Sequence, residues 1–367
     1  MSMNHVPLTA AKLASRDTLS HSEMVAYTYC KQAHFFRYEK RLIPREEKEN
    51  LTLWLAINRG LSVWYDSFNK TKALTTVEES LQGSDFKSRL LPLISGMLEG
   101  YIEHWKQRDT FKVLQIDLPY ITPIITPSGR ASRIQDLAGV VPLVIEKPDG
   151  SVWIVIHRSI AKKDPSLSER LECDIRIRAA CWALNRYLIS GVSGVIVNVL
   201  RAKLPVEPEI LKNGTISKRS NIDTTLEVFA AALNRTSSNN HADYSAILDR
   251  LAAEDNSFFT RWERAYSPGE MERIGQELYL ISRDMRRASR ELPYGNSNSC
   301  TSYGLCPYLD LCAGRLDPDA VETNFRKLDT RHPALADVNI DSLRLSTRPK
   351  RKYGSNNVPR AYTDLVQ

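Results

Sequence analysis

Residues 134–160 have the sequence IQDLAGVVPLVIEKPDGSVWIVIHRSI. Two runs rich in β-branched residues flank a Lys147-Pro148-Asp149-Gly150 turn, in which Pro and Gly favour the backbone angles of a tight turn. The pattern predicts a β-hairpin, around which the rest of the chain can be placed.

The segments on either side of this hairpin predict an α/β fold. Residues 111–124 form another strand-like run before it. After it, residues 166–190 carry apolar side chains at helical spacing, and residues 194–205 (GVIVNVLRAKLP) are typical of a buried strand. The order strand, hairpin, helix, strand indicates α/β packing, with a core at about residues 111–204.

Helices are expected on both sides of this core. Residues 19–40, with Ser20 or Ser22 as an N-cap, 45–68 and 85–109 are long and amphipathic, so the N-terminal third is predicted to be a helical layer. Residues 205–223 resemble a loop or lid. Further helices are expected at residues 224–236 and 267–292.

The two ends of the chain differ from the rest. Residues 1–18 are expected to be flexible, and residues 315–367 to form an extended basic tail, because basic residues occur there among Ser, Pro, Asn and Gly. One domain over residues 19–314 is predicted between them. The basic residues of the tail include Arg344, Arg348, Lys350, Arg351, Lys352 and Arg360.

Composition limits the possible environments and partners. The 367 residues have a formal charge of +7, which favours an anionic partner such as DNA. No run approaches the roughly 18 apolar residues of a membrane span, and the first residues lack the apolar core of a signal peptide. We therefore expect a cytoplasmic protein without membrane contact. In that reducing compartment, its six cysteines would bind metal or be buried rather than form disulfides.

A late cysteine trio is the strongest chemical signal. Cys300, Cys306 and Cys312 are evenly spaced in NSCTSYGLCPYLDLCAG (residues 298–314), where Gly and Pro let the backbone wrap around a centre. Zinc and four-iron clusters normally take four protein ligands, so a fourth must come from elsewhere. Cys30 is the best candidate. Four thiolates suit iron or zinc, and both metals remain open.

Other candidate sites are weaker. Cys173 and Cys181 fall within the central helical pattern and are interpreted as small core residues. His157 is interpreted as a packed or surface residue of its strand. The sequence contains no Walker loop, dinucleotide fingerprint or nucleophile elbow.

Two cysteine-containing motifs carry a family resemblance. Ser22, Tyr27 and Cys30 form S-x4-Y-x2-C, and the late trio ends in C-P-Y-x3-C. Over residues 20–314 the chain resembles the iron-sulfur subgroup of PD-(D/E)XK nucleases, which includes RecB-like phage and bacterial exonucleases, AddB-type recombination subunits and the nucleases of CRISPR adaptation.

The resemblance implies a restriction-endonuclease-like core sheet flanked by helices. It also implies a [4Fe-4S] cluster that holds the N-terminal helix and the C-terminal segment together. For function, it implies action on DNA in repair and recombination, with a helicase, recombination or nuclease-complex partner. The cluster ligands implied are Cys30, Cys300, Cys306 and Cys312.

This sequence departs from the family at each catalytic motif position. The family pattern has G-x-x-D, D/E-x-K and Q-x3-Y motifs and often a histidine on an earlier helix. Proline and isoleucine offer no side-chain oxygen to Mg²⁺ or Mn²⁺, and arginine stays protonated, so it cannot act as a general base. The residues at these positions are Trp64, Pro142, Ile156, Arg158, Arg176 and Ala180.

The leading hypothesis is therefore a nuclease-like protein without catalytic activity that binds DNA or a recombination complex. Guanidinium and ammonium groups would then contact phosphate where the metal site is missing. An alternative interpretation is simple decay, with these cations as solvated surface residues. The candidate DNA-binding residues are Arg158, Lys162, Lys163, Arg176 and Arg178.

Two further hypotheses remain. The protein could be an active Mg²⁺- or Mn²⁺-dependent exonuclease with relocated ligands, using Glu172 or Asp174 with Lys162. It could instead be a structural or inhibitory protein-interaction module. Manganese-dependent degradation of DNA would identify the first of these, and salt-dependent DNA binding would argue against the second.

Overall fold

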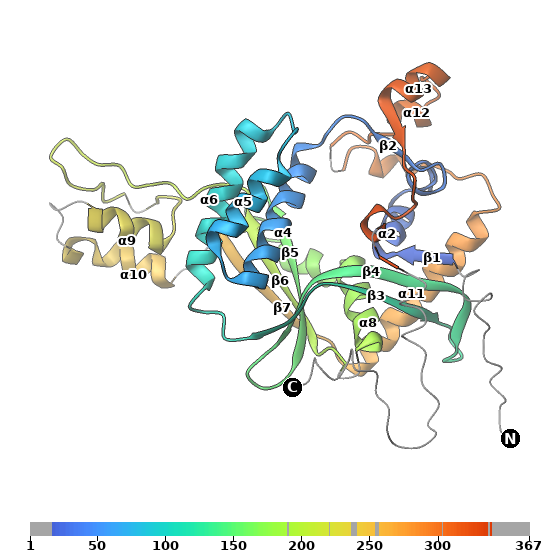
Figure 1. Ribbon diagram of the computed structural model, residues 1–367, viewed down its shortest axis with the longest axis horizontal. Helices are drawn as coiled ribbons and strands as arrows, with labels where there is room; N and C mark the ends of the chain where they lie inside the picture. Colours follow the sequence, from blue (N-terminus) through green and yellow to red (C-terminus); the bar gives the residue numbers. More distant parts are fainter. Residues whose placement is uncertain are drawn as a thin grey trace.

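A mixed sheet forms the centre of the computed structural model (Figure 1). The expected flexible N-terminus lies mostly outside the described residues, and the tail residues Arg344 to Arg360 lie wholly outside them. No helix in the described parts of the chain is long and apolar enough to cross a membrane. The structure describes residues 17–188, 191–219, 221–235, 241–253, 257–302, 304–336 and 338–339.

The sheet follows the predicted order of strands. β3, β4 and β5 are antiparallel neighbours, and the N–H of Gly150 donates to the carbonyl of Lys147 (2.9 Å) in the turn between β4 and β5. The chain then crosses through α8 to β6, which runs parallel to β5. The prediction of an α/β core flanked by helices is confirmed. The strands of this sheet are β1 (Asp17–Ser20), β3 (Lys112–Ile125), β4 (Ala131–Glu146), β5 (Val152–Ile160), β6 (Gly194–Arg201) and β7 (Phe259–Ala265).

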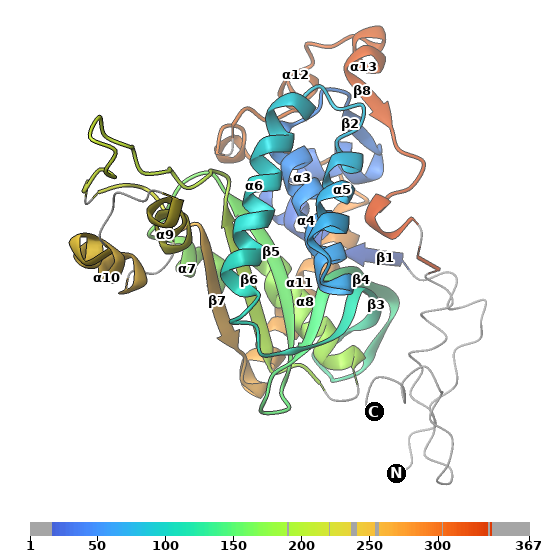
Figure 2. The same cartoon turned by 60° about the vertical axis from the view of Figure 1, so that its left-hand side comes forward.

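Helices cover both faces of the sheet (Figures 1 and 2). Alternate strand residues point to opposite faces, so Ile154 and Val197 pack toward α8 and α11, whereas Val155 and Ile196 pack toward α4 and α6. Both sets are almost fully buried. The covering helices are α4 (Glu49–Ser67), α5 (Lys70–Ser80) and α6 (Lys87–Trp105) on one face, and α8 (Ile175–Tyr187) and α11 (Pro268–Ala288) on the other.

The long strand β4 has a divided edge. Its residues 135–138 pair with β1, and its residues 143–146 pair with β5 on the same side of the sheet. Residues 139–142 lie between these two pairings. Pro142 lies in this gap, where neither β1 nor β5 needs a backbone N–H from it, and proline has no such N–H to donate.

The remaining elements lie around this core. α9 and α10 have a small apolar core of their own and project away from the sheet, at the left of Figure 1. β2 and β8 form a separate two-stranded sheet that joins the N-terminal and C-terminal parts. These elements are α2 (His21–Tyr29), α3 (Lys31–His34), the π-helical turn Phe35–Glu39, β2 (Leu42–Pro44), α7 (Leu167–Glu172), α9 (Leu226–Arg235), the 3-10 turn His241–Tyr244, α10 (Ser245–Ala253), the 3-10 turn Ser297–Ser299, α12 (Leu309–Cys312), α13 (Pro318–Asn324), β8 (Phe325–Lys327) and the 3-10 turn Pro333–Leu335.

Two predicted helices are each interrupted. The helix expected over residues 19–40 is broken at Cys30, whose backbone is extended between α2 and α3. The helix expected over residues 166–190 is broken at Asp174, whose side chain accepts a hydrogen bond from the N–H of Arg176 (2.8 Å) and caps α8. Cys173 lies at this second break and is exposed, so its interpretation as a core residue was wrong, whereas Cys181 is buried as expected.

The prediction of an extended tail from residue 315 was wrong for its first part. Asp317 caps α13 by accepting the N–H of Ala320 (2.7 Å), and Pro318 starts the helix. β8 then pairs with β2, and Leu335 is buried against Ile121. The composition was polar and basic, so it did not reveal these few anchoring contacts.

Candidate metal centre and cleft

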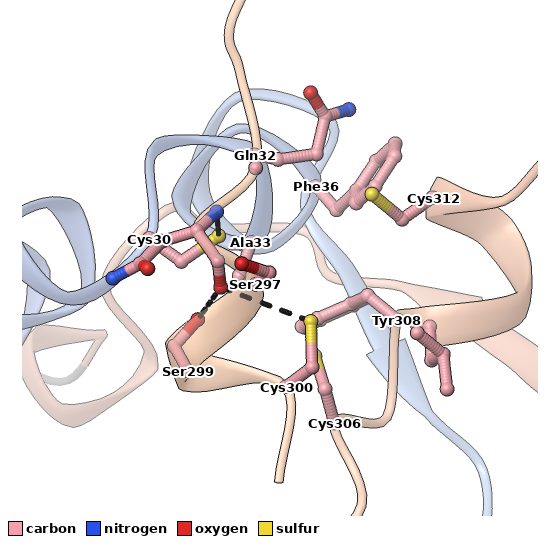
Figure 3. A pocket seen from close by; sticks show the side chains of 13 residues that line it. Cys30, Gln32, Ala33, Phe36, Ser297, Ser299, Cys300, Cys306, Tyr308 and Cys312 are labelled. Carbon is pink, nitrogen blue, oxygen red and sulfur yellow. Dashed lines mark hydrogen bonds between the residues drawn. The ribbon is translucent and has the colours of Figure 1, made fainter. Parts of the chain in front are cut away.

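Four cysteines from distant parts of the chain line one cavity of about 240 Å³. Cys30 comes from the junction of α2 and α3, and Cys300, Cys306 and Cys312 from the segment after α11. Figure 3 shows their side chains around the same space. The structure thus brings together the thiols that the sequence singled out.

Hydrogen bonds from backbone and side-chain groups hold the two segments together at this cavity. The N–H of Asn296 donates to Sγ of Cys30 (3.4 Å), and its side-chain Nδ2 donates to the carbonyl of Tyr29 (2.9 Å). The N–H of Gln32 donates to the carbonyl of Tyr294 (3.2 Å). The position of Cys30 relative to the trio is therefore fixed by the protein itself.

The thiols influence one another electrostatically. Burial raises the pKa of the Cys306 thiol, and the nearby Cys300, Cys30 and Cys312 raise it further. Burial also raises the pKa of Cys30, but N–H donors including that of Asn296 outweigh it and lower this pKa below its usual value. Four thiolates in one cavity repel one another, and a bound metal cation would relieve that repulsion.

A cluster of charged groups surrounds the buried carboxylate of Glu23, on the helix that ends at Cys30. Glu23 is fully buried, and Oε1 is 3.0 Å from Nε2 of His34 and 3.0 Å from Nε of Arg331. Arg331 also pairs with Glu39 (3.2 Å) and Asp17 (3.2 Å). Oxygen and nitrogen atoms of Glu23, His34 and Glu39 lie within 4.8 Å of one another, a spacing that could suit a metal ion. Here the guanidinium group already supplies the positive charge, and it ties α2 to the C-terminal segment.

A cleft of about 990 Å³ lies at the divided edge of β4. Its lining includes the start of α2, the segment leading into α4, the strands β4 and β5, and α8. Most of the predicted motif positions share this cleft. They are Pro142, Ile156, Arg158, Arg176 and Ala180.

Two arginines that line the cleft share one aspartate, and three glutamates, Glu46, Glu47 and Glu49, line the wall that leads into α4. Arg158 and Arg176 both pair with Oδ2 of Asp174, the latter at 3.0 Å. Burial raises the pKa of Asp174, but the hydrogen bond from Arg176 and the charge of Arg158 outweigh it and lower this pKa below its usual value. The carboxylate is ionised and carries two guanidinium partners, so the group has an excess of positive charge.

The other sequence candidates lie elsewhere. Trp64 is buried in the helical layer beside α5 and α6 and is not among the residues that line the cleft. Arg178 pairs with Glu277 on α11 (2.7 Å), and Glu172 pairs with Arg264 on β7 (2.7 Å). Lys162 and Lys163 are exposed just after β5. Glu172 is thus engaged outside the cleft, away from the relocated site that it was expected to form.

Sequence reasoning missed the aromatic wall of the cleft. Trp54 lines it and is 40% exposed, and Leu51 and Leu55 beside it on α4 are each 54% exposed. These three positions share one face of the helix. The sequence does show a second apolar face on this helix, which could have indicated the wall of the cleft. A helical pattern alone, however, does not show which of two apolar faces is buried.

A buried polar network supports the floor of the cleft. Asn198 on β6 donates through Nδ2 to Nδ1 of His157 (3.1 Å) and to the hydroxyl of Tyr101 (2.7 Å). Arg261 donates to Oδ1 of Asn198 (2.7 Å) and pairs with Asp109. Burial lowers the pKa of His157 to about 3, so this residue is a neutral, packed histidine near neutral pH.

Comparisons with known proteins give only distant similarities. No protein-family model matches the chain, and no curated protein matches its sequence. One similar solved structure is a candidate exonuclease from Eubacterium rectale, with 9% identity, coverage of 85% of this chain and 95% of that one, and a TM-score of 0.42. Another is the protein SSO0001, with 12% identity, coverage of 64% and 88%, and a TM-score of 0.20.

Proposed function

We propose that this protein is a nuclease-like protein that binds DNA in its cleft without cutting it, and that its four clustered cysteines hold a [4Fe-4S] cluster. The observation that carries the proposal is the pairing of Arg158 and Arg176 with Asp174 in the cleft. In this proposal, the guanidinium groups take the part that a divalent cation would play in an active nuclease of the family that the sequence resembles.

The size and spacing of the cysteine cavity support a cluster over a single zinc ion. Tetrahedral zinc, with Zn–S bonds of about 2.3 Å, would hold its sulfur atoms about 3.8 Å apart. Within the described residues, no three of these thiols have sulfur atoms within 4.8 Å of one another. A cavity of about 240 Å³ has room for an eight-atom cluster, and all four donors are thiols, as iron-sulfur clusters require.

The chemistry of the cleft argues against metal-dependent cleavage. Pro142 and Ile156 contribute no side-chain oxygen, and Asp174 is already neutralised by two cations. The carboxylates of the facing wall are partly engaged elsewhere, because Glu47 accepts a hydrogen bond from Ser84 and Glu49 pairs with Arg89. A Mg²⁺ ion at that carboxylate would be repelled by both guanidinium groups at short range. The residues present therefore do not fit the metal centre of a nuclease, and we derive no cleavage step.

The same features suit the binding of single-stranded DNA. Arg158 and Arg176 can donate paired hydrogen bonds to phosphate oxygens. Trp54, on another wall of the cleft, offers an exposed ring on which a base can stack, a contact worth about 1–3 kcal/mol. Cation and ring together would recognise a backbone and an unpaired base.

Fluorescence anisotropy with a labelled single-stranded oligonucleotide tests this proposal. We expect Arg176→Gln to weaken binding about 10-fold and to lower the slope of log affinity against log salt by about 0.7, the value for one lost phosphate contact. Trp54→Ala is expected to weaken binding about 10-fold with the slope unchanged, because stacking releases no counterion.

Arg235→Gln is the matched control. This arginine is 61% exposed on α9, far along the chain from the cleft, and is paired with Glu207 (3.1 Å). Its replacement removes the same charge and should leave affinity and slope unchanged. Equal affinity of wild type, Arg176→Gln and Trp54→Ala for the oligonucleotide would contradict binding in the cleft.

A further inference from the structure

Four arginines gather on one face at the C-terminal end of α11. Three of them lie on the last turns of α11 at helical spacing, and Arg290 follows just past the C-cap, Ser289. All four are exposed, and with Glu291 they line a surface hollow of about 400 Å³. We call this set the arginine stripe, and its members are Arg283, Arg286, Arg287 and Arg290.

The stripe has little compensating charge. Within the described chain, none of its arginines has a carboxylate oxygen within 4.0 Å. Exposed Arg273 and Arg326 also have no ion pair among the described residues, but each of them stands alone, whereas four such arginines gather in the stripe. Asp284, inside the stripe in sequence, is used differently. Its Oδ2 accepts from the hydroxyl of Tyr27 (2.7 Å) and from Nζ of Lys31 (3.0 Å), on the helices that carry Cys30.

Stability of the helix does not account for this arrangement. Like charges three or four residues apart destabilise a helix by about 0.2–0.5 kcal/mol per pair. The negative end of the helix dipole offsets part of this, by about 0.3–1 kcal/mol per favourable charge near the last turn. Four mutually repelling cations on one rigid face are better explained by an anionic partner.

We propose that the arginine stripe is a second contact for nucleic acid, which binds the phosphate backbone. Arg283 and Arg287 are separated by about 6 Å along the axis of α11, and Arg290 follows just past its C-cap, so one strand can meet several guanidinium groups at once. Guanidinium groups match phosphate oxygens in paired hydrogen bonds. The inference rests on the proposed DNA binding but concerns a different surface.

Helix α2 links the cleft to the helix that carries most of the stripe. Its first residues, His21 and Ser22, line the cleft, and its Tyr27 contacts Asp284 between the arginines. Six residues of helix span only about 9 Å. The part of α2 that lines the cleft is therefore about 9 Å from the contact of α2 with α11, the helix that carries most of the stripe.

Salt-dependent binding of a labelled oligonucleotide by the full-length, iron-checked protein tests the stripe. We expect Arg286→Gln/Arg290→Gln to lower the slope of log affinity against log salt by about 1.4, for two lost contacts to a single strand. Affinity at low salt should fall at least 10-fold. Both side chains are exposed, so the melting temperature should stay unchanged.

The control is Arg235→Gln/Arg315→Gln, which removes the same net charge from exposed positions on α9 and after α12. An equal loss in this control, or an unchanged slope in the stripe variant, would overturn the inference. Displacement by poly-aspartate as effective as by unlabelled DNA would overturn it too, and would indicate an acidic protein partner.

Failure of the inference can be told apart from failure of the proposed function. If the wild-type protein binds no oligonucleotide, both fall together. If Arg176→Gln and Trp54→Ala weaken binding while the stripe variant binds as the wild type does, the cleft stands and only the stripe is rejected.

Discussion

Replacement of Cys306 by alanine is expected to remove iron from the protein and to destabilise the clasp between its two ends. Purified under anaerobic conditions, the wild type should hold about four iron atoms per chain and the variant less than one. Loss of a structural metal centre is among the largest single-site effects, so the free energy of unfolding should fall by roughly 4 kcal/mol or more. Iron analysis and thermal unfolding measure both.

The two cysteines outside the cavity provide matched controls. Cys173 is exposed, so Cys173→Ser should change neither iron content nor stability. Cys181 is fully buried, so Cys181→Ala should cost about 1 kcal/mol through lost packing and leave the iron in place. Full iron loading of Cys306→Ala would contradict the assignment of Cys306 as a cluster ligand. One zinc ion and no iron per wild-type chain would show that the four cysteines bind zinc instead of an iron-sulfur cluster.

Replacement of Arg331 by leucine is expected to lower the free energy of unfolding by about 3 kcal/mol. Glu23 is fully buried, and removal of the guanidinium group leaves its charge with only the two histidines nearby, His34 and His332. Chemical unfolding at pH 7 measures the loss. Arg315→Leu, which breaks an exposed pair with Asp310, should cost less than about 1 kcal/mol.

The stability lost in Arg331→Leu is also expected to depend on pH. Burial raises the pKa of Glu23, but its hydrogen bond with His34 and the charge of Arg331 outweigh burial and lower this pKa below its ordinary value of 4.5. A lowered carboxyl pKa stabilises the fold above pH 4.5, and this contribution is lost as pH falls through the folded-state pKa. The difference between wild type and Arg331→Leu should therefore be full at pH 7 and shrink in acid. A difference that grew in acid would contradict an ionised Glu23.

The central sheet could be predicted because its signals are local. The β-branched runs around the turn at Lys147 to Gly150 define the hairpin, and residues 194–200 form a buried strand that is apolar except at Asn198. β7 was not predicted. Its residues 259–265 lie at the edge of the sheet and mix apolar with charged side chains, so they form no continuous apolar run. β1 has only four residues and forms through its pairing with β4.

Positions that depend on distant contacts could not be predicted. No local pattern indicates that Arg331 reaches Glu23, 308 residues earlier in the chain. Trp64 was matched to a motif by its helix alone, and Trp54, nearly three turns before it, lines the cleft instead. The cysteines could be grouped across the chain in advance because their chemistry demanded a fourth ligand, and the family motifs grouped five of the residues that line the cleft.

A combined binding and cleavage assay tests the central claim most directly. Iron-loaded protein is mixed with labelled single-stranded DNA in Mg²⁺, in Mn²⁺ and in a chelator that leaves the cluster intact, and both bound fraction and strand length are measured. The account predicts equal binding in all three and full-length DNA throughout, because arginines rather than a divalent cation hold the phosphates. Shortened DNA in Mg²⁺ or Mn²⁺, abolished by Asp174→Asn, would contradict it and establish a relocated nuclease site.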